Sequence, residues 1–202
     1  RGGATLSSVL NCIEKAKRSV NPPIVLFSYF NPLLRFGPKP LAERARAAGV
    51  DAILVTDLIP EEAEGRSWEE TLMSQQLAPI YLVAPTTSES RLRLIAKRTR
   101  GFLYAVSRAG VTGARSEMAR DAQSLVERVR KVSDVPVAVG FGISTSEQVR
   151  EVWRYADGAV VGSAIVQKIE ERSGNADLVR QVGDFTRSLL ATAPAGDAHF
   201  VS

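Results

Sequence analysis

Six short apolar runs recur along the chain, and segments with helical periodicity separate them. Most of the runs follow Pro or Gly and end in small or polar residues. Continuous apolar runs of about five residues are typical of strands buried on both faces, as in parallel sheets. The runs that we interpret as strands cover residues 23–29, 52–57, 79–85, 101–107, 136–142 and 158–164. Alternation of strand and helix predicts an α/β fold.

The strand starts are spaced about 20–35 residues apart, the length of one βα unit. Such a repeat forms either a doubly wound sheet or a (β/α)8 TIM barrel. No G-x-G-x-x-G pattern follows the first run, which weakens the dinucleotide-binding interpretation. Glycines at the ends of the last two runs instead suit the phosphate site that barrels build after strands seven and eight. The first run is then strand three.

We therefore expect residues 1–202 to form a single (β/α) barrel domain that is N-terminally truncated and contains strands three to eight. A barrel without two of its strands exposes strand edges and interior layers. The chain is thus expected to be a fragment or to be completed by a further segment.

Helical periodicity over residues 6–17 predicts a helix that carries Cys12 on its packed face. Ser88 and Ser144 are expected N-caps, and Ser144 has the capping-box spacing to Glu147. The other predicted helices cover residues 38–49, 60–76, 88–98, 119–132 and 144–156.

Composition argues against several classes of protein. A single cysteine excludes an intramolecular disulfide and a cysteine-based zinc site, which fits a reducing compartment. The only histidine, His199, stands three residues from the end, so we expect no catalytic role for it. The net charge is +4, but no basic stretch is interleaved with aromatic residues, so nucleic acid is not an expected partner. No apolar run reaches the 18 residues typical of a membrane span, so no membrane association is expected.

Glycine-rich turns stand where the last two predicted strands lead into helices. Glycine lets backbone N–H groups approach an anion, and the following helix contributes the positive end of its dipole. We expect a phosphate pocket whose donors are the amides of Gly113, Gly142, Gly162 and Ser163, together with the Ser163 hydroxyl. The alternative is that these glycines only allow tight turns and close packing.

Several strand residues would converge near the same end of a barrel. They form an apolar, partly aromatic lining that suits a flat hydrophobic group with a phosphorylated tail. Filling of the core is the competing explanation for each. The residues are Phe27, Leu54, Leu82, Tyr104, Phe141 and Val160.

Carboxylates are scarce at the predicted strand ends. Asp57 ends its strand, a position that in barrels is catalytic or forms an interface. Glu61 and Glu62 are expected in the first turn of the next helix, where the helix dipole explains them. No second inward carboxylate stands near another strand end, so no general acid/base pair can be assembled.

Four segments together resemble the α subunit of tryptophan synthase: "YLVAPTT" (81–87), "GFLYAVSRAGVTGAR" (101–115), "PVAVGFGIST" (136–145) and "ADGAVVGSAIV" (156–166). The upstream "PIVLFSYFNPLLRFG" and "AGVDAILVTDLIPEE" match the middle part of that family. The resemblance is collinear from about residue 3 to residue 190.

The resemblance implies a (β/α)8 barrel and a lyase of tryptophan biosynthesis. Such an enzyme cleaves indole-3-glycerol phosphate to indole and glyceraldehyde 3-phosphate by a retro-aldol reaction, with no organic cofactor or metal. Thr112 matches the loop threonine that hydrogen-bonds the catalytic aspartate, and Tyr29, Asn31 and Asp57 match the region that faces the β subunit. A complex of two α and two β subunits is implied, in the cytoplasm, or in a plastid if the source is a plant.

The sequence departs from the family in the catalytic segments. The family's glutamate in E-L-G-x-P-F-S-D-P and its aspartate in A-D-G-P do not occur among the 202 residues, so we expect this chain to be inactive alone. Thr56 and Ile59 stand where small residues and proline are common. One alternative is a non-catalytic phosphate-binding or regulatory module that partners a β subunit. Another phosphate-binding barrel, such as a sugar-phosphate isomerase or epimerase, is disfavoured by "VSRAGVTGAR" and "VAPTT".

Overall fold

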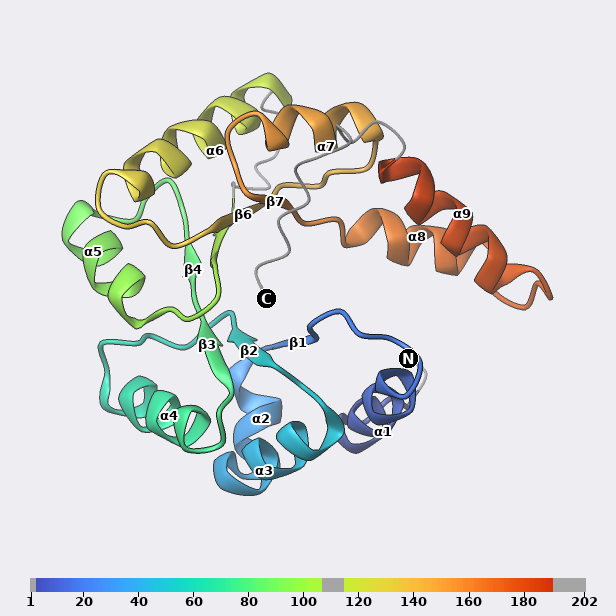
Figure 1. Cartoon of the computed structure of the whole chain (residues 1–202), viewed down its shortest axis with the longest axis horizontal. Coiled ribbons are helices and arrows are strands. Elements are labelled where there is room, and N and C mark those ends of the chain that lie inside the picture. Colours follow the sequence, from blue (N-terminus) through green and yellow to red (C-terminus); the bar gives the residue numbers. More distant parts are fainter. Residues whose placement is uncertain (1–2, 107–114, 191–202) are drawn as a thin grey trace. The chain divides into compact units, whose positions relative to one another are not determined.

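The computed structural model describes residues 3–106 and 115–190, in which strands and helices alternate (Figure 1). The strands are β1 (Val25–Ser28), β2 (Ala52–Val55), β3 (Ala78–Ile80), β4 (Leu82–Val83), β5 (Leu103–Val106), β6 (Val137–Gly140) and β7 (Gly158–Ala159). The helices are α1 (Leu6–Lys17), α2 (Phe30–Phe36), α3 (Pro38–Ala48), α4 (Ala63–Ser74), α5 (Glu89–Arg98), α6 (Arg115–Arg130), α7 (Ser146–Trp153), α8 (Ser163–Glu171) and α9 (Leu178–Leu190).

The chain divides into two compact units. Within the described residues, unit 1 comprises 3–83, 87–104 and 129–135, and unit 2 comprises 84–86, 105–106, 115–128 and 136–190. The expectation of a single domain stays a prediction.

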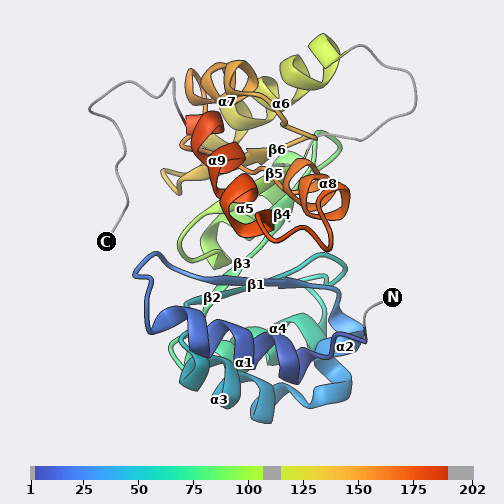
Figure 2. The ribbon, with the colours of Figure 1, turned by 90° about the vertical axis from the view of Figure 1, so that its right-hand side faces the viewer.

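Unit 1 contains a parallel sheet in the order β1-β2-β3. Its register pairs Phe27 with Leu54 and Leu54 with Ile80. Helices α1 to α4 lie on one side of this sheet, as Figure 2 shows. The crossovers through α3 and α4 are what parallel pairing requires, since a tight hairpin cannot connect parallel strands.

Strand β2 is buried on both faces, and its alternating side chains enter two different clusters. Ile53 and Val55 pack on the helical side, in a cluster that includes Leu41 of α3 and Trp68 and Leu72 of α4. On the opposite face, Ala52, Leu54 and Ile80 form a second cluster, with Leu82, Phe102 and Tyr104 packed against it. The continuous apolar run "AILV" therefore has the double burial that the sequence predicted.

A second sheet has the order β4-β5-β6-β7. Strands β6 and β7 pair in parallel, with Ala138 opposite Gly158 and Val139 opposite Ala159. Asp157, just before β7, accepts a hydrogen bond at 2.8 Å from the Val137 amide at the start of β6. This bond satisfies a backbone donor at the edge of the ladder.

Two predicted strands differ from the structure. The run 79–85 is split between β3 and β4, because the amide of Tyr81 bonds the Thr99 hydroxyl at 3.3 Å instead of continuing the first ladder. The run 158–164 contributes only Gly158–Ala159 as β7, because Gly162 already acts as the N-cap of α8.

Local helix signals explain most boundaries. Helix α1 has the predicted extent, but Cys12 is exposed, so its predicted packing was wrong. The capping box of α7 is formed by Thr145 and Gln148, one residue beyond the predicted Ser144–Glu147 pair. Their spacings are identical, so only the backbone geometry distinguishes them.

Two further helix starts refine the predictions. Ser88 is the N-cap of α5, as predicted, although its side chain makes no capping hydrogen bond. Helix α4 begins at Ala63, so Glu61 and Glu62 precede its first turn and Glu64 is the acidic residue within it. Among the helices of residues 3–106 and 115–190, none combines the length and apolar character needed to cross a membrane.

Candidate functional site

Two glycine turns follow the neighbouring strands β6 and β7 of unit 2. Gly142 has φ of 81°, a left-handed conformation that favours glycine. Space is open where a Cβ on Gly142 or on Gly162 would stand. Gly142 follows the end of β6 by two residues and Gly162 follows the end of β7 by three, so both glycines lie just beyond the carboxyl ends of two paired strands. The two glycine turns therefore follow adjacent strands and have open space around them, and phosphate binding by them stays a prediction.

The start of α8 provides further donors. Gly162 is the N-cap and makes no side-chain capping bond, and Ser163 is the first helical residue. Both residues are exposed. The first amides of a helix lack intrahelical acceptors and point outward along the axis, so they can donate to an anion. Gly113, the fourth predicted phosphate donor, lies outside the described residues, as does Thr112.

An apolar surface with two aromatic rings lies on the β1-β2-β3 sheet of unit 1, on the face opposite to helices α1 to α4. The rings of Phe27 and Tyr104 meet edge to face, with centroids 6.0 Å apart and planes at 87°. Phe27 is 55% exposed although it is aromatic, and Leu54 beside it is buried. Burial raises the pKa of the Tyr104 phenol, so the group stays neutral near neutral pH. Leu82 is half-buried against the same cluster.

The remaining predicted lining residues belong to unit 2. Phe141 stands directly before Gly142, and Val160 follows β7; both are half-buried. The Val160 amide donates to the Val139 carbonyl at 2.8 Å, which extends the β6–β7 ladder by one bond beyond the strand. This bond keeps the segments that follow β6 and β7 paired for one residue beyond β7.

The three residues predicted to face a partner come together in unit 1. Asp57, on the loop after β2, accepts a hydrogen bond from the Phe30 amide at 2.6 Å. Phe30 is the first residue of α2 and stands between Tyr29 and Asn31 in the chain. Tyr29 is 67% exposed, and Asn31 and Asp57 are exposed as well. The Asp57 carboxylate thus acts first as a structural acceptor, one that joins two loops into one surface.

An apolar cavity of about 340 Å³ lies next to this surface. Phe30 and Trp68 line it and meet edge to face at 5.7 Å. The other lining residues are Leu34, Pro38, Ala63, Glu64 and Ser67. This cavity was not predicted from the sequence. Helix α2 lies between the predicted strand 23–29 and the predicted helix 38–49, in a segment where no helix was predicted.

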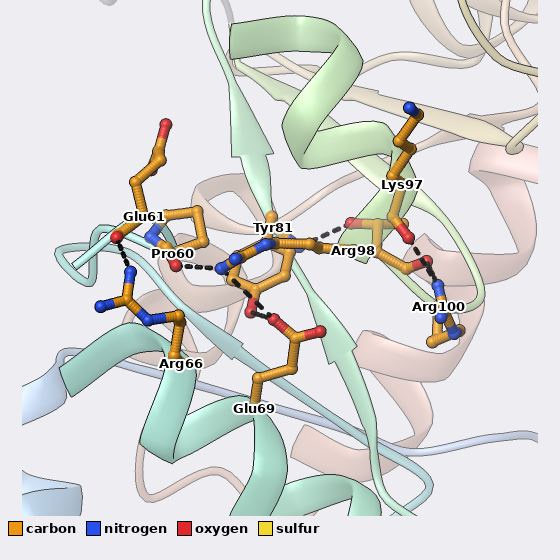
Figure 3. A network of polar contacts seen from close by, with 9 residues as sticks. Pro60, Glu61, Arg66, Glu69, Tyr81, Lys97, Arg98 and Arg100 are labelled. Atoms are coloured by element: carbon orange, nitrogen blue, oxygen red, sulfur yellow. Dashed lines mark hydrogen bonds and ion pairs between the residues drawn. The ribbon is translucent and has the colours of Figure 1, made fainter. Parts of the chain in front are cut away.

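A second cavity, of about 160 Å³, lies beside the loop after β2. Residues 55–60 line one side of it, and Tyr81, Leu82, Arg91 and Ile95 line the other. The hydroxyl oxygen of Thr56 is buried and has no hydrogen-bond partner among the described residues. Arginines from α4 and α5 bond the same loop (Figure 3), and the sequence carried no signal that linked these side chains to it.

Metal ligands do not gather in the part of the chain that the structure describes: no three His, Cys, Asp or Glu side chains come close enough to hold an ion. The chemistry that these residues offer is hydrogen bonding to an anion in unit 2 and packing against a flat ring in unit 1.

Comparison with known proteins places these features in a family. Residues 1–193 match the model of the tryptophan synthase alpha chain family. The chain is 42% identical over 189 residues to the tryptophan synthase alpha chain of Solibacter usitatus, covering 94% of this chain and 70% of the relative. It is 45% identical over 187 residues to the alpha chain of Citrifermentans bemidjiense, covering 93% and 69%.

Solved structures agree with these relatives. A mutant tryptophan synthase alpha-subunit from the hyperthermophile Pyrococcus furiosus superposes with a TM-score of 0.84 at 33% identity, covering 94% of this chain and 75% of that one. Tryptophan synthase from M. tuberculosis, in an aminoacrylate-bound form, superposes with a TM-score of 0.78 at 34% identity, covering 94% and 70%. The α/β fold with parallel sheets is consistent with part of a (β/α)8 barrel, as the sequence predicted.

Proposed function

Because this chain belongs to the tryptophan synthase alpha chain family, which is a family of lyases, we propose that it binds indole-3-glycerol phosphate. The observation that carries the proposal is the pair of open glycine turns on β6 and β7 in unit 2. Two such turns at the ends of adjacent parallel strands present several uncovered amides to one anion, whereas a turn needed only for packing would be covered.

The substrate phosphate is bound in this proposal by the amides of Gly142, Gly162 and Ser163, with the Ser163 hydroxyl as a fourth donor. The exposure of all three residues supports the assignment. The amide of Gly113 is proposed as a further donor from outside the described residues. Helix α8 adds its dipole, which favours negative charge at its N-terminus.

The indole ring is proposed to pack on apolar side chains. In unit 1 these are Phe27, Leu54, Leu82 and Tyr104, and the exposed face of Phe27 next to the Tyr104 ring supports a flat aromatic ligand. Phe141 and Val160, the predicted lining residues in unit 2, are half-buried and stay predictions.

Cleavage of the substrate breaks the bond between ring carbon 3 of indole and the hydroxyl-bearing carbon of the glycerol chain. The hydroxyl loses its proton and becomes the aldehyde of glyceraldehyde 3-phosphate, while the ring carbon gains a proton. Two proton-transfer groups are required. The family segments that supply them do not occur among the 202 residues, and so we propose that this chain alone does not turn over substrate. Thr112 is proposed to hydrogen-bond the aspartate when that segment is present.

The first experiment measures binding of indole-3-glycerol phosphate by isothermal titration calorimetry. Gly142→Ala places a side chain at a left-handed residue and over the proposed phosphate, and we expect affinity to fall about tenfold. Gly174→Ala is the matched control, because Gly174 also has φ of 81° and open space but stands outside the strand ends. Equal affinities of the two variants would reject the phosphate site.

A second experiment measures indole release from indole-3-glycerol phosphate by residues 1–202 alone. We expect no turnover above the uncatalysed rate. Measurable turnover that is lost in Asp57→Asn would show that the chain has its own catalytic carboxylate, and it would overturn the proposed inactivity.

The partner proposed for this chain is a tryptophan synthase β subunit, bound through Tyr29, Asn31 and Asp57. The shared surface of these exposed residues supports the assignment. Titration against a bacterial β subunit tests it, with Tyr29→Ala expected to weaken binding by tenfold or more, since exposed aromatics at interfaces contribute much of the affinity. Tyr155→Phe, in unit 2, serves as a control.

A further inference from the structure

The loop between β2 and α4, residues 57–62, carries Asp57 and is held by side chains of two helices. Arg98 of α5 donates to the carbonyl of Pro60, and Arg66 of α4 donates to the carbonyl of Glu61 (Figure 3). Arg91 of α5 forms an ion pair with the Glu61 carboxylate at 3.0 Å. Cationic donors therefore bind two successive peptide carbonyls of one loop, and hydrogen bonds of this kind are stronger than those between neutral groups.

The same loop lies in close contact with the first turn of α4. A Cβ on Gly65 would stand 2.2 Å from the Ile59 carbonyl oxygen and 2.7 Å from the Pro60 Cα. Gly65 is helical and buried, so the absence of a side chain serves the approach of the two backbones. The loop is thus confined on the side of α4 as well as on the side of α5.

Arg98 is the member of this group that also reaches the sheet. Its guanidinium lies 3.7 Å from the Glu69 carboxylate, and both side chains are about three-quarters buried, with 25% and 23% exposure. Glu69 in turn accepts a hydrogen bond from the Tyr81 hydroxyl at 3.2 Å. Figure 3 shows the Arg98 guanidinium between Pro60 and Glu69, with the Tyr81 ring beside it.

The protonation state of Tyr81 suits this arrangement. Burial, together with the neighbouring Glu69 carboxylate, raises the pKa of the phenol well above its usual range. The phenol therefore stays a neutral donor toward Glu69, and the Arg98 guanidinium faces the same carboxylate oxygen, Oε2, that accepts from the phenol. A planar guanidinium can serve two acceptors in fixed directions, which a lysine ammonium does less well.

The opposite end of the loop holds α2. Asp57 bonds the Phe30 amide at 2.6 Å, a short charge-assisted hydrogen bond, and Phe30 stands between the exposed residues Tyr29 and Asn31. Any shift of residues 57–62 changes this bond and moves Asp57 relative to α2. The position of the surface formed by Tyr29, Asn31 and Asp57 therefore depends on the bonds at Pro60 and Glu61.

We infer that Arg98 is a positioning residue, which links the Pro60 carbonyl to Glu69 and Tyr81 and so holds the loop 57–62 in place. In this position of the loop, Asp57 bonds the Phe30 amide. The surface at the start of α2 is then already formed before its partner binds. The link from Arg98 to the Asp57–Phe30 bond stands on the geometry alone. The consequence for the β subunit rests on the proposed function. Preformed surfaces bind more tightly, because less conformational entropy is lost on association.

The Phe30 amide is the reporter for the test. Its exchange with deuterium and its amide proton shift are measured in the full chain by NMR after selective labelling of phenylalanine with ¹⁵N. In Arg98→Met we expect exchange at Phe30 to be about tenfold faster and its amide shift to move toward that of Asp57→Asn, since a hydrogen bond to a charged group is weakened. Arg98→Lys should fall between Arg98→Met and the unsubstituted chain.

Two controls separate positioning from general loss of structure. Arg93→Met removes an exposed arginine from the same helix and should leave the Phe30 signal unchanged. Glu69→Gln keeps an acceptor for Tyr81 but removes the ion pair with Arg98, and it should reproduce part of the Arg98→Met effect. If Arg98→Met and Arg93→Met give the same Phe30 exchange, the positioning role is overturned.

Affinity for the β subunit is the second readout. We expect Arg98→Met to bind about tenfold more weakly than Arg93→Met, although neither residue belongs to the proposed contact surface. Equal affinities would overturn the role in partner binding. If the unsubstituted chain itself fails to bind, the proposed partner is wrong, and the Phe30 exchange alone decides whether Arg98 positions the loop.

Discussion

Helices α3 and α4 of unit 1 and helices α8 and α9 of unit 2 are buried to very different degrees, although the second pair is the more amphipathic. Helix α3 of unit 1 buries Leu41 and three alanines, and α4 buries Trp68 and Leu72. Helix α8 of unit 2 buries no residue, and α9 buries only Leu189. Val166 and Ile169 of α8 are 54% and 42% exposed. An apolar stripe therefore predicts a helix, whereas the burial of that stripe depends on the surface that faces it.

The strands differ in the same way. All four residues of β2 are buried, since helices cover one side of the sheet and Leu82, Phe102 and Tyr104 pack against Ala52 and Leu54 on the other. Strand β7 has two residues, Gly158 and Ala159, and both are only half-buried. Stability in the described residues is therefore expected to be concentrated around β2 and its helices.

The sharpest test of this comparison removes the same kind of side chain from each region. Leu72→Ala, at a fully buried position of α4, is expected to cost about 2–5 kcal/mol of unfolding free energy. Ile169→Ala on α8 is expected to cost less than about 1 kcal/mol, because the side chain is partly solvated. Urea unfolding, followed by Trp68 fluorescence in a Trp153→Phe background and by circular dichroism, measures both. Equal losses would show that α8 is covered in solution.

Two glycines provide the next contrast. Gly65→Ala in α4 creates a contact with the Ile59 and Pro60 backbone and is expected to destabilise unit 1 by about 1–3 kcal/mol. Gly183→Ala in α9 meets only the flexible Arg187 guanidinium, at 3.6 Å, and is expected to stabilise the helix by up to about 1 kcal/mol. Thermal unfolding compares them, and a stabilising Gly65→Ala would contradict the tight packing of the loop 57–62.

Capping boxes should not distinguish the units, because they are local. Thr5 accepts from the Ser8 amide at 3.1 Å in α1, and Thr145 accepts from the Gln148 amide at 3.3 Å in α7. Thr5→Ala and Thr145→Ala are each expected to cost about 1 kcal/mol. Ser88→Ala is the control, since that side chain makes no cap bond. If the two substitutions reduced the free energy of unfolding by amounts that differ several-fold, tertiary packing would contribute to the effect of these capping residues.

The smallest expected effect is the contribution of Asp51 to the pH dependence of folding stability. Burial disfavours ionisation of Asp51, but the Ile24 amide at 2.8 Å and Lys17 at 3.1 Å more than offset it and hold the pKa below the ordinary 3.8. A lowered pKa in the folded state stabilises above the unfolded pKa, and the contribution disappears as pH falls through the folded value.

Asp51→Asn should therefore reduce stability near neutral pH by less than about 1 kcal/mol, since the carboxylate is partly solvated. The difference should shrink as pH falls below 3.8 and disappear once pH is below the lowered pKa of Asp51 in the folded chain. Urea titrations across that range measure it, with Lys17→Met as a variant that keeps the bond to Ile24. A difference that grows toward low pH would contradict the sign of the shift.

Local patterns predicted much of the fold. The apolar run 52–57 specified a doubly buried strand, and the periodicity of residues 6–17 specified α1, because these signals are carried by neighbouring residues. The motifs around Gly142 and Gly162 placed two glycine turns at the ends of adjacent strands, where the structure has them. The family was identified from the same segments, and the comparisons confirmed it.

Contacts between groups far apart in the chain could not be predicted from the sequence. The interruption at Tyr81, the burial of Gly65 against Pro60 and the bonds of Arg98 to Pro60 and Glu69 join residues separated by many positions in the chain. An arginine on a helix has the same propensity whether it faces solvent, as Arg93 does, or a loop carbonyl. Most strands, most helices and the family could be predicted from the sequence, because these depend on neighbouring residues. The position of Asp57 depends on packing between elements, and only the folded chain specifies it.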